Sequence, residues 1–310
     1  IYGAYHLYTE PEKLLRSLGD NLEWGRLEID LIRFEGPEFE SVDCRFMALK
    51  LVELSLADAV VFNADQETLI HPSELFYNKD IMVMRSNFKP ITRVSEDMMD
   101  SGMEIFRRLP EVEKDTAIRV PEISVAQVRT ENSVDMKEIL DRVDCLNLLG
   151  FPVIVSSYLR YFRIRDYLGR YTSRKVAFVL GIPNLMTIFN PDYYQGHKGG
   201  MLGAFASLFD HDTVLIVYPM CCRNRPDEVV TAQTFHVNQS LKHFYYYLLE
   251  NHMILPVEKY NNANMHIWPE DVLRQIRNGP GEWEKEVPAP VARQIMDKGL
   301  FGFNSGTGNA

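Results

Sequence analysis

The sequence is poor in cysteine and has no long apolar run. Only four cysteines occur among its 310 residues, and no two of them are spaced as CxxC. This content argues against a disulfide framework and a structural zinc site, and it favours a reducing soluble compartment such as the cytoplasm or an organelle matrix or stroma. The longest apolar stretches, Leu148–Ser156 and Met201–Phe209, fall short of the ~18 residues that a membrane span requires. We therefore expect no membrane span.

An excess of basic charge is also missing. The chain has 33 lysines and arginines against 43 aspartates and glutamates, which gives a formal net charge of −10. Nucleic acid is therefore disfavoured as the main partner, because neutralising phosphates needs basic surface. The hydrophobic share of 46% and the charged share of 25% are those of a globular protein. Because the chain begins at Ile1 rather than methionine, we expect a processed or trimmed N-terminus.

The common signatures of catalysis and phosphate binding are absent as well. The chain contains no GxGxxG or GxxxxGK[ST] loop, no GxSxG elbow and no HExxH helix. His236 and His243 have no third ligand at helical spacing, so we expect no metal site. The sequence thus leaves open the cofactor, the reaction and whether the chain is an enzyme.

Alternating strand and helix patterns fill the middle of the chain. Three continuous apolar runs, which are typical of strands covered on both faces, are separated by helical patterns: Pro152–Val155, Val176–Leu180 and Val214–Tyr218. This order predicts an α/β fold with a Rossmann-like parallel sheet and flanking helices. We expect Val153, Phe178 and Ile216 to lie in neighbouring parallel strands of that sheet.

The N-terminal region has a different pattern. Between residues 57 and 94, short apolar runs such as Ala59–Phe62 and Ile81–Met84 are separated by turn residues, which predicts a small β-rich unit distinct from the parallel sheet. We divide the chain into a helical and β-rich N-terminal region (1–112), an α/β parallel-sheet domain (113–268), and C-terminal helices with a loose tail (269–310).

Two helices are marked by local signals. Asp135 is followed three residues later by Glu138, a capping pattern, and apolar residues then recur at helical spacing as far as Leu149. A second helix is predicted from Leu241 to Leu249, where apolar residues recur at i, i+3, i+4, i+7 and i+8.

One segment is strongly basic. Residues 158–175 hold five arginines and one lysine against a single aspartate, a local charge of +5. On a helix, Arg160, Arg163, Arg170 and Arg174 would share one arc. This stripe favours either a phosphate site, since guanidinium binds phosphate bidentately, or a docking face for an acidic partner. An amphipathic surface helix with solvated charges would give the same pattern.

Polar residues also follow the predicted strands. Ligands of open parallel sheets bind beyond the carboxyl ends of the strands, and Ser156, Ser157 and Asn184 occupy such positions. The loop at residues 190–200 brings His197 close to a pair of glycines, and we consider His197 a candidate for acid–base chemistry. The proposed ligand-binding residues are Ser156, Ser157, Arg160, Arg163 and Asn184.

Several motifs resemble those of an uncharacterised family of bacterial and algal proteins. They run from Ala57-Asp58-Ala59-Val60-Val61-Phe62 through Tyr161-Phe162-Arg163-Ile164-Arg165-Asp166-Tyr167-Leu168 to Gly299-Leu300-Phe301-Gly302. Labels used in that family include nicotinate-nucleotide adenylyltransferase, which the resemblance implies as an activity. Another label, TonB-dependent receptor, implies an outer-membrane protein, which the predicted buried βαβ strands contradict. Adenylyltransferases of this class carry HxGH-type and ISSTxxR-type motifs. Gly196-His197-Lys198-Gly199 departs from the first, so no catalytic residue is carried over.

Two hypotheses from different classes follow. In the first, the chain is a Rossmann-like protein that binds a nucleotide or another phosphorylated small molecule, with nucleotidyl transfer as its reaction. In the second, it is a non-catalytic structural subunit of a larger assembly, whose basic helix and aromatic-rich helix contact an acidic protein partner.

Overall fold

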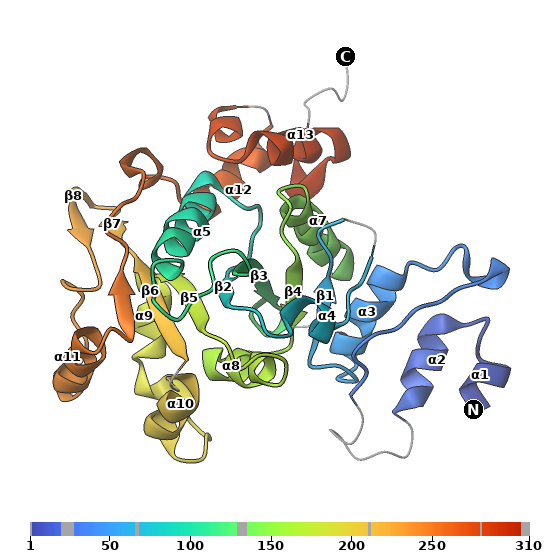
Figure 1. The fold of residues 1–310 in the computed structure, drawn as a ribbon. Helices are drawn as coiled ribbons and strands as arrows, with labels where there is room; N and C mark the ends of the chain where they lie inside the picture. The colour runs from blue at the N-terminus through green and yellow to red at the C-terminus, as the bar shows by residue number, and fades with distance from the viewer. Residues whose placement is uncertain are drawn as a thin grey trace. The chain divides into compact units, whose positions relative to one another are not determined.

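The computed structural model describes residues 2–19, 28–65, 68–128, 135–209, 212–279 and 281–304. The chain forms two compact units that interleave along the sequence (Figure 1). The first contains residues 1–75 and 121–159, and the second contains residues 76–120 and 160–310. This division differs from the three consecutive regions expected from the sequence. The last residues of the predicted tail, 305–310, lie outside the described part of the chain.

The first unit combines helices with three strands. In chain order its elements are α1 (Tyr2–His6), α2 (Pro11–Leu18), α3 (Cys44–Glu53), β1 (Ala59–Phe62), α6 (Val125–Val128), α7 (Met136–Asn147) and β4 (Val153–Ser156). The strand β3 (Ile118–Ser124) enters this unit at Pro121. β4 pairs with β1 in antiparallel and with β3 in parallel orientation. As the sequence predicted, the side chain of Asp135 caps α7, because it accepts the N–H groups of Lys137 and Glu138.

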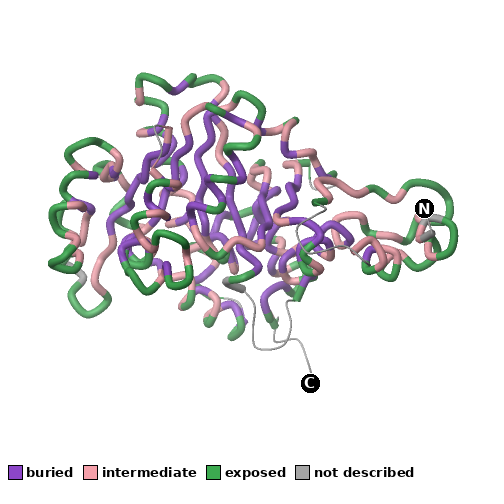
Figure 2. The backbone as a smooth tube through the Cα atoms, turned by 90° about the horizontal axis from the view of Figure 1, so that it is seen from below, coloured by how far each residue is buried: buried purple, intermediate pink, exposed green. Residues whose placement is uncertain are grey.

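The second unit contains four parallel strands. They are β2 (Ile81–Arg85), β5 (Val176–Gly181), β6 (Thr213–Tyr218) and β9 (Ile254–Pro256), and they lie in that order. All three neighbouring pairs are parallel. Every residue of β2 and β6 is buried, and Figure 2 shows the buried backbone following the strands. The predicted α/β class, a Rossmann-like parallel sheet with flanking helices, is confirmed.

Helices and a hairpin complete the second unit. They are α5 (Arg93–Phe106), α8 (Tyr161–Gly169), α9 (Ile182–Ile188), α10 (Gly200–Leu208), the hairpin β7 (Met220–Cys222) and β8 (Arg225–Val230), α11 (Lys242–Glu250), α12 (Pro269–Arg277) and α13 (Ala289–Lys298). α5 packs against β2, β5 and β6, α9 packs against β5 and β6, and α8 contacts α10. α11 confirms the helix predicted from the apolar spacing at residues 241–249.

The separate β-rich unit predicted for residues 57–94 is wrong. β2 pairs in parallel with β5, from Ile81 opposite Val176 to Met84 opposite Val179. The last predicted strand of that unit, residues 91–94, instead leads into α5. Only the first strand–turn–strand pattern forms a short hairpin, in which Phe62 is bridged to Leu69. A short apolar run fits a local partner and a distant one equally well, so its sequence does not choose between them.

The expected set of neighbouring strands is also corrected in part. Phe178 and Ile216 do lie in adjacent parallel strands, and both are almost fully buried. Val153, however, lies in β4, which pairs with β1 and β3. In addition, Pro121 does not interrupt its strand, because β3 continues through it to Ser124.

Replacing Ile216 with alanine tests the packing of β6. The side chain is fully buried, and its strand has β5 on one side and β9 on the other. We expect Ile216→Ala to lower the free energy of unfolding by about 2–5 kcal/mol, because the lost transfer energy adds to the cost of a cavity. Urea unfolding of the variant and the parent chain measures this loss. A loss below about 1 kcal/mol would show that the core does not pack around β6.

Candidate functional site

The first turn of α8 is the point at which several polar side chains meet. Tyr161, the first residue of this helix, is buried. Its hydroxyl accepts a hydrogen bond of 2.8 Å from the side-chain amide of Asn184, near the start of α9. The guanidinium of Arg85, at the end of β2, lies 4.9 Å from the centre of the Tyr161 ring. Tyr161 therefore connects the carboxyl end of β2 with the helix that follows β5.

Arg160 ties this turn to the loop that precedes α10. It is the N-cap residue of α8, and its Nη2 donates to the carbonyl oxygen of Gln195 at 2.9 Å. Its Nε is buried and has no hydrogen-bond partner in the described part of the chain. The nearby Tyr194 is buried, and this burial raises the pKa of its hydroxyl, although the positive charge of Arg160 acts in the opposite direction. Arg160 thus holds a cationic group beside the loop and keeps one donor available.

His197 and Arg163 both contact Phe162. The centres of the His197 and Phe162 rings are 4.6 Å apart, and the Arg163 guanidinium lies 5.5 Å from the centre of the Phe162 ring. Arg163 is exposed, whereas His197 is half-buried. The loop turns into α10 at Gly199, which has a φ of +81°, a conformation that glycine adopts without strain.

Four of the six residues singled out from the sequence therefore gather around one helical turn. Arg160 begins the turn, Arg163 lies within it, Asn184 reaches it through Tyr161, and His197 reaches it through Phe162. α9 starts directly after β5, so Asn184 follows the carboxyl end of a parallel strand, where ligands of such sheets bind. Two guanidinium groups, an amide and an imidazole can together bind a phosphate and move a proton.

The two predicted serines belong to the first unit, where both already form hydrogen bonds. Ser156 is fully buried, and its hydroxyl donates to the carboxylate of Glu122. The same oxygen accepts the N–H of Tyr158 at 3.2 Å. The hydroxyl of Ser157 donates to the backbone oxygen of Asp58, also at 3.2 Å. Their role in ligand binding stays a prediction.

Arg85 is the residue at this turn that the sequence analysis missed. It is 3% exposed although it carries a charge, and it ends a strand whose other four residues are apolar. An arginine that closes a buried strand was a usable signal, because charged side chains are rarely buried without a partner. The segment containing β2 had been interpreted as part of a local hairpin, which placed Arg85 away from the parallel sheet.

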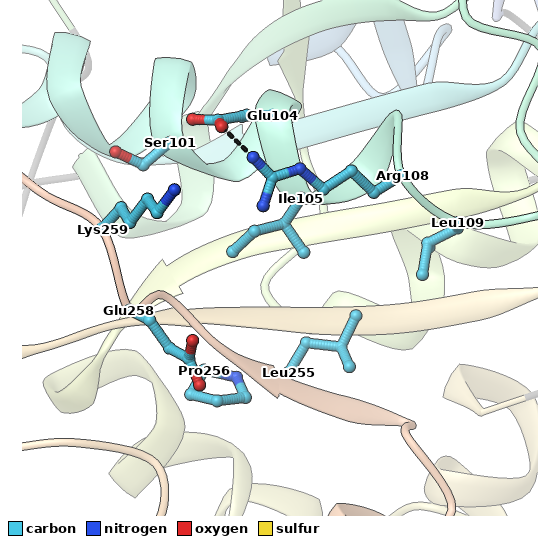
Figure 3. A pocket seen from close by; sticks show the side chains of 9 residues that line it. All are labelled: Ser101, Glu104, Ile105, Arg108, Leu109, Leu255, Pro256, Glu258 and Lys259. Atoms are coloured by element: carbon cyan, nitrogen blue, oxygen red, sulfur yellow. Dashed lines mark hydrogen bonds and ion pairs between the residues drawn. The ribbon is translucent and has the colours of Figure 1, made fainter.

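A cavity of about 290 Å³ lies between α5 and β9 in the same unit (Figure 3). Its apolar lining consists of Ile105, Leu109, Leu255 and Pro256. The charged residues Glu104, Arg108, Glu258 and Lys259 also line it, and Ser101 completes the wall. None of these residues was singled out from the sequence.

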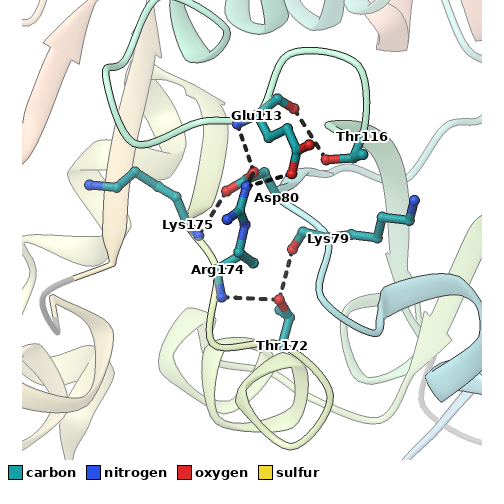
Figure 4. Close-up of polar contacts among 7 residues, drawn as sticks. All are labelled: Lys79, Asp80, Glu113, Thr116, Thr172, Arg174 and Lys175. Carbon is teal, nitrogen blue, oxygen red and sulfur yellow. Dashed lines mark hydrogen bonds and ion pairs between the residues drawn. The ribbon is translucent and has the colours of Figure 1, made fainter.

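The basic stripe predicted for residues 158–175 is wrong as a single helical surface. α8 ends at Gly169, so Arg170 follows the helix and Arg174 lies well beyond it. Arg165 is buried, and its Nε donates to the Thr213 hydroxyl at the start of β6. Arg174 instead contacts Asp80 and Glu113, each at 3.0 Å (Figure 4). The stripe divides because buried polar groups at the amino ends of β2 and β6 attract two of its cations.

Asp80 is the centre of this second polar cluster. Its carboxylate is fully buried directly before β2. One oxygen accepts from Arg174 and from the N–H of Glu113, and the other accepts the N–H of Lys175 at 3.0 Å. The cluster lies at the amino ends of β2 and β5, opposite to the end where parallel sheets bind ligands. We therefore assign it a structural role.

No helix that the structure describes is both long and apolar enough to cross a membrane. The described side chains also form no group of three or more histidines, cysteines or carboxylates that could hold a metal ion.

Comparison with known proteins gives two similar structures. No protein-family model matches the chain, and no curated protein is significantly similar to it in sequence. Two solved structures of the Plasmodium falciparum nicotinic acid mononucleotide adenylyltransferase, complexed with APC and with NaAD, are 12% identical to it. The similarity covers 73% of this chain and 99% of each of the others, with TM-scores of 0.44 and 0.42. Its function has therefore to be sought in its own side chains.

Replacing Asp80 with asparagine tests the structural role of the cluster. Asparagine keeps the size but removes the charge, which leaves Arg174 without its buried partner. We expect Asp80→Asn to lower the free energy of unfolding by about 3–5 kcal/mol. Glu111→Gln is the matched control, since Glu111 pairs with Lys175 at 3.5 Å but is 63% exposed, and it should cost less than about 1 kcal/mol. Equal urea midpoints for the two variants would contradict this assignment.

Proposed function

We propose that the chain binds a nucleotide or another phosphorylated small molecule at the first turn of α8. The observation that supports this most directly is the convergence of Arg160, Arg163, Asn184 and His197 on one turn, since they come from three separate segments of the second unit. Two cations close together suit a dianionic phosphate, because charge-assisted hydrogen bonds from guanidinium are among the strongest available to proteins.

Each residue has a separate part in the proposal. Arg163 is exposed and offers its guanidinium to the ligand from solvent. Arg160 is oriented by Gln195, and its buried Nε is a donor without a hydrogen-bond partner. The side chain of Asn184 is oriented by Tyr161. A donor that is already oriented loses less entropy when the ligand arrives.

Nucleotidyl transfer is the reaction that we propose for this site. An oxygen of an acceptor phosphate attacks the α-phosphorus of a nucleoside triphosphate, and pyrophosphate leaves. Arg160 and Arg163 would stabilise the negative charge on the transferring group. His197 is the proposed acid–base residue, and it would supply a proton to the leaving pyrophosphate.

A second candidate function is that of a structural subunit with an acidic protein partner. α11 exposes two neighbouring aromatic side chains, since Tyr246 is 44% exposed and Tyr247 is 55% exposed. Exposed aromatic residues are enriched in protein interfaces. Under this hypothesis, Arg163 would contact carboxylates of the partner instead of a ligand phosphate.

Binding of ATP to the Arg163→Ala variant tests the first proposal. We expect the free energy of binding, measured by titration calorimetry, to weaken by about 1.5–3 kcal/mol, the range for a hydrogen bond to a charged group. His197→Ala should bind ATP like the parent chain but transfer nucleotide more slowly. Arg293→Ala is the control, because Arg293 is exposed on α13 and should bind normally.

The same panel separates the two candidate functions. If neither ATP nor any other nucleotide raises the thermal midpoint of the parent chain, and if the chain is purified within a larger complex, the subunit hypothesis is favoured. In that case Arg163→Ala should speed dissociation from the partner and make association less sensitive to salt.

A further inference from the structure

We propose a second anion site, on the flank of α5, that takes a phosphate monoester with an apolar ester group. It does not depend on the function proposed for the turn of α8. A cavity of about 380 Å³ is lined by the C-terminal half of α5 and by two segments after it. Its lining residues are Asp100, Met103, Glu104, Arg107, Arg108, Lys114 and Arg119. We call this cavity the α5 pocket.

The α5 pocket has more positive than negative charge. Four of its seven lining residues are cationic and two are acidic, in a chain whose net charge is −10. Arg108 pairs with Glu104 and Arg119 pairs with Asp100. Arg107 and Lys114 form no ion pair with any residue that the structure describes. Both carboxylates are thus matched, and two cations remain for an anion.

The helix dipole explains only part of this cluster. Cations near the C-terminus of a helix are favoured by its dipole, which accounts for Arg107 and Arg108. Lys114 and Arg119 do not belong to α5, since Lys114 lies in the following loop and Arg119 lies in β3. Three separate segments therefore contribute cations to one cavity.

The loop that carries Lys114 is held in place from behind. The N–H of Glu113 donates to the buried Asp80 at 2.9 Å, and the carboxylate of Glu113 pairs with Arg174 (Figure 4). The N–H of Ala117 returns to the oxygen of Glu113 at 3.1 Å. The buried side chain of Met103 also lines the pocket. The backbone that positions the cation is fixed before a ligand binds, which lowers the entropic cost of binding.

The cavity shown in Figure 3 adds an apolar neighbour. The two cavities share Glu104 and Arg108, which form the ion pair drawn there. Beyond that pair, Ile105, Leu109 and Leu255 give an apolar lining. Cavities of this size are within or close to the usual range for small ligands. A ligand with a phosphate in the α5 pocket could place an apolar group against this lining, which is why we propose a monoester.

Binding of two simple probes to the full chain tests the proposal. Phenyl phosphate and inorganic phosphate are each titrated by calorimetry. We expect phenyl phosphate to bind more tightly, because only it can contact the apolar lining. Lys114→Ala should weaken the binding of both probes by about tenfold or more, as expected for the loss of a hydrogen bond to a charged group. Leu255→Ala should reduce the advantage of phenyl phosphate alone.

Matched controls separate this site from the turn of α8. Lys137→Ala removes an exposed lysine from α7 and should change neither affinity. Arg163→Ala should also leave the affinities for both probes unchanged, whereas it weakens ATP binding if the proposed function is correct. The proposal is overturned if the parent chain binds neither probe, if both probes bind equally well, or if Lys114→Ala binds them like the parent chain.

Discussion

The buried carboxylate of Asp80 is the constraint on which much of the second unit depends. A charge without access to water is stable only when cations or N–H groups surround it. Arg174 and the N–H groups of Glu113 and Lys175 meet this need. Since Asp80 immediately precedes β2 and Lys175 immediately precedes β5, the same contacts align the starts of two neighbouring strands. Ile81 consequently lies opposite Val176.

This alignment also separates the work done at the two ends of the strands. Arg165 and Arg174 are used at the amino ends, where they satisfy Thr213 and Asp80. Arg160 lies at the opposite end of α8, beside the loop that contains His197. Residues close together in sequence therefore serve different purposes, because the helix between them carries the chain from one end of the sheet to the other. A single stretch of basic sequence contributes to stability at one end and to the candidate site at the other.

The sequence predicted those elements whose signals are local. The Asp135 cap and the apolar spacing of α7 are satisfied within a few residues, and the buried runs of β5 and β6 are long enough to be recognised. It failed where the partner is distant in the chain, as with β2, whose neighbour β5 begins at Val176. The helical arc through Arg174 failed for a related reason, since it assumed a helix that continues past Gly169. Four site residues were found from strand ends and charge, but Arg85 required the correct neighbour of β2.

The charges at the beginning of α8 have a cost for the free protein. The amino end of a helix dipole is positive and is normally stabilised by acidic side chains or by a capping oxygen. Here the N-cap is Arg160, no side chain caps the helix, and the first turn contains Arg163 but no acid. Replacing these cations with acidic or capping residues would relieve the repulsion and remove the donors that the turn offers to an anion. Selection for thermal robustness alone would therefore be expected to erode this turn, so stability and ligand recognition compete at the same few positions.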